Sequence, residues 1–224
     1  MRYTWPLLVS AALLLLPLAF WAERFDMTIW QDRLILPNFI EEPHRHTPRQ
    51  TSGTWLPPVI TKSQTFSAEQ SPLIVSGITR IPAGVTLTLA AGTTVAFAEF
   101  AHLDIKGTLV SSGSEQAPVR LISNELHPSN QLWGGLIFSD TARGELSHTE
   151  IEQAAPAVSC LNASQVTVRW SRIHLGSMGI LVTSPHCVID QSVISAARDG
   201  IVSIGATPVV TATSIMAPQP ATQH

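Results

Sequence analysis

The chain has 224 residues and a mass of 24.2 kDa, which suits one compact domain with additional segments rather than several domains. Its residues are 45% hydrophobic and only 13% charged, a balance that excludes a disordered or coiled-coil chain. The net charge of -3 and the absence of a basic stripe exclude a general nucleic-acid binder, and two cysteines exclude a disulfide-rich scaffold.

Residues 1–22 are predicted to form a transmembrane signal anchor. Residues 3–22 carry no charge, and as a helix they would span about 30 Å, the thickness of a bilayer core. Arg2 and the amino terminus precede this segment, so the N-terminus is expected in the cytoplasm and the remainder in the periplasm or outside the cell. A cleaved signal peptide is the alternative, although a cut after Ala22 would place the bulky Phe20 where a small residue is required.

Residues 23–63 are expected to form a tether or arm, because prolines interrupt them and no period is sustained. The segment 27–40 is too apolar for a free linker, and it is expected to pack on the domain or lie on the membrane surface. At the other end of the chain, residues 217–224 are expected to be a disordered tail rich in alanine, proline, threonine and glutamine.

The segment 64–216 contains a repeat of about 22 residues. Four similar segments start at Leu136, Val158, Ile180 and Ile201, with offsets of 22, 22 and 21 residues. Isoleucine recurs in a later slot of each segment, at Ile151, Ile173, Ile194 and Ile215. Short alternating apolar runs at such a period predict an all-β solenoid, a parallel β-helix of about six coils.

The alternation also predicts which side chains face the core. The apolar columns point inward, and with them Cys160, which is expected to be a buried thiol. A hydroxyl column is expected to form an internal ladder at Thr149, Ser171, Ser192 and Thr213.

Upstream of the repeat, the order of motifs resembles a known class. The chain reads Thr-Leu-Thr-Leu at 86–89, Leu-Asp-Ile-Lys-Gly-Thr-Leu at 103–109 and Trp-Gly-Gly-Leu at 133–136. These motifs resemble the opening coils of right-handed parallel β-helix proteins of the pectin-lyase-like class, over residues 72–216. The resemblance implies the fold but no single activity, because the class includes lyases, hydrolases, adhesins and structural proteins.

Outward columns carry the candidate catalytic residues Glu150, Glu152, His174 and Arg172. One interpretation is a set of surface ion pairs between neighbouring coils. The other is a general acid/base set of Glu150, Glu152 and His174, with Arg172 binding an acidic sugar. Two carboxylates on one face of one strand would lie about 7 Å apart, which permits glycoside hydrolysis without requiring it.

A second outward column is apolar at Ile137, Leu181 and Val202. Either the N-terminal arm covers this stripe, or it docks a partner or a second copy of the chain. Self-association could also occur at the last coil, which has no obvious polar cap.

These features favour a non-catalytic, membrane-tethered β-helix that serves as a recognition or scaffold module for an envelope protein or polysaccharide. The alternative is a carbohydrate-active enzyme, a polysaccharide lyase or hydrolase that uses the four charged residues. The sequence predicts no cofactor, no metal and no nucleic-acid partner.

Overall fold

The computed structural model describes residues 52–125 and 133–216. The predicted anchor, most of the predicted tether and the predicted tail lie outside the described residues. Within the described ranges, no helix is both long and apolar enough to cross a membrane. All of the described residues belong to one compact unit of the chain, residues 46–224.

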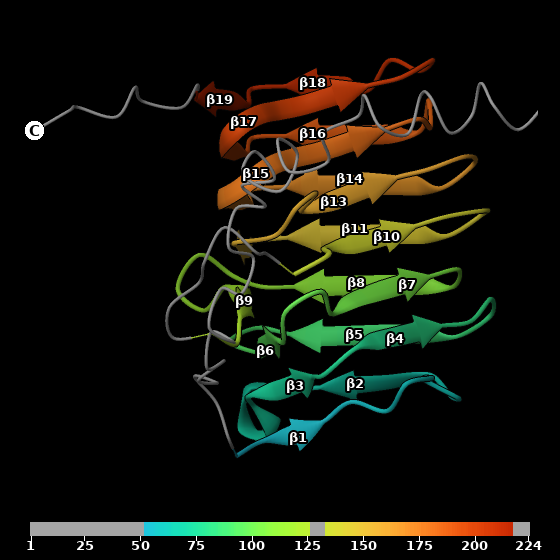
Figure 1. Ribbon diagram of the computed structural model, residues 1–224, viewed down its shortest axis with the longest axis vertical. Helices are drawn as coiled ribbons and strands as arrows, with labels where there is room; N and C mark the ends of the chain where they lie inside the picture. Colours follow the sequence, from blue (N-terminus) through green and yellow to red (C-terminus); the bar gives the residue numbers. More distant parts are fainter. Residues whose placement is uncertain (1–51, 126–132, 217–224) are drawn as a thin grey trace, which may run out of the picture. The chain divides into compact units, whose positions relative to one another are not determined.

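The described chain folds as an all-β parallel solenoid of about 7 turns, in which each turn adds a strand to three faces (Figure 1). The first face consists of β1 (Thr54–Trp55), β3 (Leu73–Val75), β6 (Thr94–Phe97), β9 (Val119–Ser123), β12 (Thr149–Glu152), the first parts of β15 (Arg172–Val182) and β17 (Val193–Ser203), and β19 (Ser214–Met216). The second face consists of β4 (Ile78–Ile81), β7 (His102–Ile105), β10 (Leu136–Phe138), β13 (Val158–Cys160) and the last parts of β15 and β17. The third face consists of β2 (Gln64–Phe66), β5 (Thr86–Ala90), β8 (Thr108–Ser112), β11 (Arg143–Ser147), β14 (Gln165–Arg169), β16 (Cys187–Asp190) and β18 (Val209–Thr211).

Two features modify this simple plan. Strands β15 and β17 run on from the first face into the second, so that the two faces join into one 12-stranded sheet. A short 3-10 helix, Ala68–Gln70, follows β2 and is the one helix among the described residues.

The predicted columns are confirmed by the register of the strands. Leu136 pairs with Val158, Val158 with Ile180, and Ile180 with Ile201. The four isoleucines of the first face are also in register along β12, β15, β17 and β19. Because like side chains stack along the axis, each turn fills the space above the turn before it, and one continuous apolar core results.

The predicted hydroxyl column is confirmed as a ladder at the corner before the first face. The backbone N–H of Thr149 donates to Ser171 Oγ at 3.1 Å, and the N–H of Ser171 donates to Ser192 Oγ at 3.2 Å. The Ser171 hydroxyl in turn donates to the carbonyl of Arg169 at 2.7 Å. Each hydroxyl therefore satisfies a backbone group that would otherwise be buried without a partner.

The solenoid begins earlier and has more turns than the sequence predicts. Thr54 and Trp55 pair with Leu73 and Ile74, and Ile60 is fully buried, so the end of the predicted tether forms part of the first turn. The sequence does not reveal this turn because β1 has only two residues, too few for an alternating pattern. Cys160 is buried and free, as predicted.

Candidate functional site

The four predicted charged residues come together on the outside of the first face. Glu150 and Glu152 belong to β12, where the buried Ile151 between them fixes their outward direction. In the neighbouring strand β15, Arg172 is the register partner of Glu150, and His174 is the register partner of Glu152. Parallel pairing of two consecutive turns thus builds the cluster.

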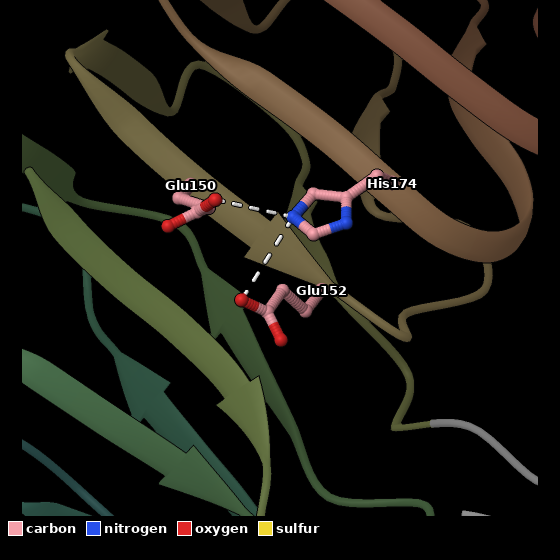
Figure 2. A group of neighbouring side chains, drawn as sticks. All are labelled: Glu150, Glu152 and His174. Atoms are coloured by element: carbon pink, nitrogen blue, oxygen red, sulfur yellow. Dashed lines mark hydrogen bonds and ion pairs between the residues drawn. The ribbon is translucent and has the colours of Figure 1, made fainter.

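His174 lies between the two carboxylates (Figure 2). Its Nε2 atom is 3.3 Å from Glu150 Oε1 and 3.8 Å from Glu152 Oε1. One carboxylate oxygen of each glutamate and one His174 nitrogen all lie within 4.8 Å of one another. The two carboxylate groups lie closer together than the separation of about 7 Å expected for alternate residues of one strand, because both side chains bend toward the same imidazole.

Arg120 is part of this cluster, and the sequence analysis did not identify it. Its guanidinium is 3.4 Å from Glu150 Oε2 and 3.1 Å from Glu152 Oε1. Arg120 lies in β9, the strand that precedes β12 on the same face, and it is the register partner of Glu150. The separation in sequence is 30 residues rather than about 22, because a longer connection follows β9 and hides the repeat.

The ion pairs of Arg120 limit what the two carboxylates can do. A guanidinium that binds both glutamates neutralises them, so that two half-buried negative charges can remain close together. Glu150, Glu152 and His174 are also the described side chains whose ligand atoms are close enough to hold a divalent cation. A cation there would have to displace Arg120 from Glu152 Oε1, the oxygen that faces both Arg120 and His174.

Arg172 is placed differently from Arg120. It lies beside Glu150 in register, yet it forms no ion pair with another described residue. Instead, it lines a surface groove of about 280 Å³ next to the charged cluster. The groove is lined by Ser114, Glu115, Pro118, His148, Thr149, Glu150, Trp170 and Arg172.

A second groove of about 290 Å³ lies on the third face, and the two grooves share Trp170. The second groove is lined by Val110, Ser111, Ser112, Glu145, Leu146, Ser147, Thr167, Arg169 and Trp170. Trp170 thus stands between two polar depressions at the corner where the third face turns into the first.

Trp170 is 48% exposed, and its ring stacks on His148 with a centroid separation of 5.2 Å and an interplanar angle of 23°. The two residues occupy the same corner position in consecutive turns, with backbone φ of 46° and 47°. Gln191 and Ala212 hold this position in the next two turns, also with positive φ. The stack follows from this repetition, because equivalent corner residues lie one strand spacing apart.

Trp170 is the second residue that the sequence analysis missed. The predicted columns were those of strands, whereas Trp170 lies in the corner directly before the hydroxyl column. The signal was nevertheless present, since His148, Trp170, Gln191 and Ala212 recur at offsets of 22, 21 and 21 residues.

Arg169, in the second groove, is partly engaged by its neighbour in the next turn. Its Nε atom lies 3.7 Å from Asp190 Oδ2, and Thr211 donates its hydroxyl to Asp190 Oδ1 at 2.6 Å. Hydrogen bonds from the Thr211 hydroxyl and from Gln191, together with the charge of Arg169, lower the pKa of Asp190 below its usual value. The Asp190 carboxylate is thus the ion-pair partner of Arg169 in the next turn.

The apolar stripe is aligned as predicted, but it is not strongly exposed. Ile137, Leu181 and Val202 lie in one register column on the second face, with the buried Ser159 between the first two. All three apolar side chains are half-buried. A docking role for this stripe stays a prediction.

Comparison of the chain with protein families, curated proteins and solved structures gave no match.

Proposed function

We propose that this chain is a non-catalytic recognition module that binds an acidic polysaccharide along the corner that carries Trp170. The observation that carries the proposal is the half-exposed Trp170 ring, stacked on His148 between two polar grooves. An indole face is apolar and electron-rich, so it can pack against the C–H face of a sugar ring while polar neighbours bind the hydroxyl groups.

The polar groups around Trp170 suit an acidic sugar. Arg172 lines one groove without an ion pair to another described residue, so its guanidinium can bind a sugar carboxylate in a bidentate manner. Glu145, Ser112 and Arg169 line the other groove and supply both donors and acceptors for hydroxyl groups. A rigid solenoid keeps these groups at fixed spacing along a polymer.

The charged cluster supports recognition rather than cleavage. Arg120 binds both glutamates, and of the two glutamates only Glu150 lines either of the two grooves beside Trp170. Glycoside hydrolysis needs one carboxyl group as an acid and another as a base or nucleophile at the same bond. Two carboxylates bound by one guanidinium are more simply explained as structural contacts that connect β9, β12 and β15 beneath the groove.

A carbohydrate-active enzyme, a polysaccharide lyase or hydrolase, is the second candidate function. It is favoured by the close approach of His174 to Glu150 and Glu152, the arrangement of a general acid/base set. In that case Arg172 would bind the acidic sugar, and the site would require Arg120 to move away.

The proposal includes a right-handed coil of the pectin-lyase-like class, which the motif order at residues 72–136 supports. It also includes a membrane anchor at residues 1–22, for which the uncharged segment 3–22 is the argument. The recognition surface would then lie outside the cytoplasm, where it could bind an envelope polysaccharide or an envelope protein that carries one.

Substitution of Trp170 tests the proposal. Trp170→Ala is expected to weaken binding to a polyuronate by about 5- to 30-fold, because aromatic contacts of this kind contribute about 1–2 kcal/mol. Affinity electrophoresis through gels that contain a polyuronate or a neutral glucan would measure the effect. The backbone accepts alanine at this corner, since Ala212 holds the equivalent position.

Two further variants make this test specific. Leu175→Ala removes another exposed apolar side chain of the same region that lines neither groove, and it should leave binding unchanged. Arg172→Gln should weaken binding to the polyuronate but not to a neutral polymer. If Trp170→Ala and wild-type protein bind every tested polymer equally, the grooves are not the recognition surface.

A further inference from the structure

The two ends of the solenoid differ in how well their apolar side chains are covered. In the first turn, Leu56, Ile60 and Phe66 are at most 7% exposed. In the last turn, five large apolar side chains are 40–61% exposed, namely Ile204, Val209, Val210, Ile215 and Met216. The core is therefore closed at its N-terminal end and open at its C-terminal end.

Two of the exposed residues belong to columns that are otherwise buried. Val210 is the register partner of Ile189, and Ile215 is the register partner of Ile194. Ile189 and Ile194 are fully buried because the next turn covers them, whereas Val210 is 40% and Ile215 is 49% exposed. Val210 and Ile215 thus lack the layer that every earlier member of their columns has.

The backbone at this end is also incompletely paired. Among the described strands, β18 pairs only with β16, and β19 pairs only with β17 (Figure 1). Proteins commonly protect such edges with charged side chains. Here residues 200–216 contain no Asp, Glu, Lys or Arg at all.

The sequence argues against coverage of this surface by the residues that follow it. Residues 217–224 contain no leucine, isoleucine, valine, methionine or aromatic side chain to fill the open core. They include Pro218 and Pro220, which have no backbone N–H to donate to a strand edge. The N-terminal turn is less suitable, because its inward-facing side chains Leu56, Ile60 and Phe66 are already buried, although the outward-facing Trp55 and Val59 are 57% and 39% exposed.

We propose that the open end binds a second copy of this chain, so that two solenoids join through their last turns about a twofold axis. The edges of β1 and β2 at the other end are unpaired too, but the inward side chains there are covered, so the described surface whose core side chains are also uncovered is the same surface of another copy. A twofold contact is self-complementary, because a strand edge can pair with its own symmetry mate in antiparallel fashion. It also ends after two copies, whereas a head-to-tail contact would continue into a filament.

The test uses the full chain, purified in mild detergent and followed by sedimentation velocity over a range of concentrations. Wild-type protein is expected to form dimers. The pair Val210→Glu/Ile215→Glu should weaken the dimer at least about tenfold, because like charges would meet across the axis. The pair Val210→Lys/Ile215→Lys should do the same, and a mixture of the two variants should associate again.

Matched controls separate this contact from others. Ile78→Glu/Phe100→Glu adds the same two charges at exposed apolar positions of the early turns and should leave the dimer unchanged. Circular dichroism should show that every variant keeps its β-sheet spectrum. A wild-type protein that is monomeric at all concentrations would overturn the proposal. A dimer that the charged variants leave intact would also overturn the proposal. The contact would then lie elsewhere, for example on the Ile137–Leu181–Val202 stripe.

Discussion

Trp133→Ala is expected to lower the free energy of unfolding by about 3–5 kcal/mol, the range found for large aromatic side chains in protein cores. Trp133 is 1% exposed, and its ring stacks on Phe97 with a centroid separation of 3.9 Å. Its Nε1–H donates to the carbonyl oxygen of Glu152 at 2.7 Å. The substitution would open a cavity and also leave that carbonyl without its partner.

The contribution of the hydrogen bond can be separated from that of the ring. Trp133→Phe keeps most of the apolar volume and removes only the donor, so it should cost about 1–3 kcal/mol. Urea denaturation followed by circular dichroism would measure both variants. Equal losses for the two variants would mean that the ring itself contributes little, which contradicts its place in the core. Because the Trp133 hydrogen bond fixes the backbone of Glu152, Trp133→Phe should also weaken the contacts within the charged cluster.

Gly135→Ala is expected to cost at least about 3 kcal/mol, and it tests how closely consecutive turns approach. Gly135 has a φ of 77°, a conformation that strains any residue with a Cβ. A Cβ at this position would also overlap the carbonyl oxygen of Pro156 in the following turn. Backbone atoms of a packed turn cannot swing aside as the end of a flexible side chain can.

Gly84→Ala is the matched control, because Gly84 has a φ of 79° but no atom within 4 Å of the added Cβ. It should cost only the conformational strain, about 1–2 kcal/mol. Thermal unfolding of both variants would compare them directly. If the two alanine variants lose the same stability, the close approach of Gly135 to the next turn is not a constraint on the fold.

The sequence predicts the later turns well because their period is regular and their columns are strict. The isoleucines at 151, 173, 194 and 215 determine the register, and the structure places them on one face. The first turn was not predicted, since a two-residue strand carries no alternating pattern. The number of turns was therefore underestimated.

The candidate site was predicted only in part, for reasons that can be traced to particular residues. Glu150, Glu152, Arg172 and His174 were found because they lie in the regular repeat. Arg120 was missed because additional residues between β9 and β10 shift its spacing from the later turns. Trp170 was missed because it occupies a corner, and strand alternation describes only the faces.

Alternation also predicts the direction of a side chain better than its exposure. Ile137, Leu181 and Val202 point away from the core as expected, yet neighbours along the column keep them half-buried. Toward the N-terminal turns, the same column continues into Asp104 and Arg80, which form an ion pair at 3.4 Å. The extent of an exposed patch depends on side-chain packing across several turns, which a single repeat does not encode.

Recognition of an acidic polysaccharide without cleavage can be tested directly. The most direct test incubates the full chain with a polyuronate, with and without calcium, and follows polymer length by size-exclusion chromatography. We expect that polymer elutes together with the protein and that the length distribution of the polymer stays unchanged. Shortened polymer that is no longer produced by a folded Glu150→Gln/Glu152→Gln variant would instead identify the charged cluster as an active site and the chain as an enzyme.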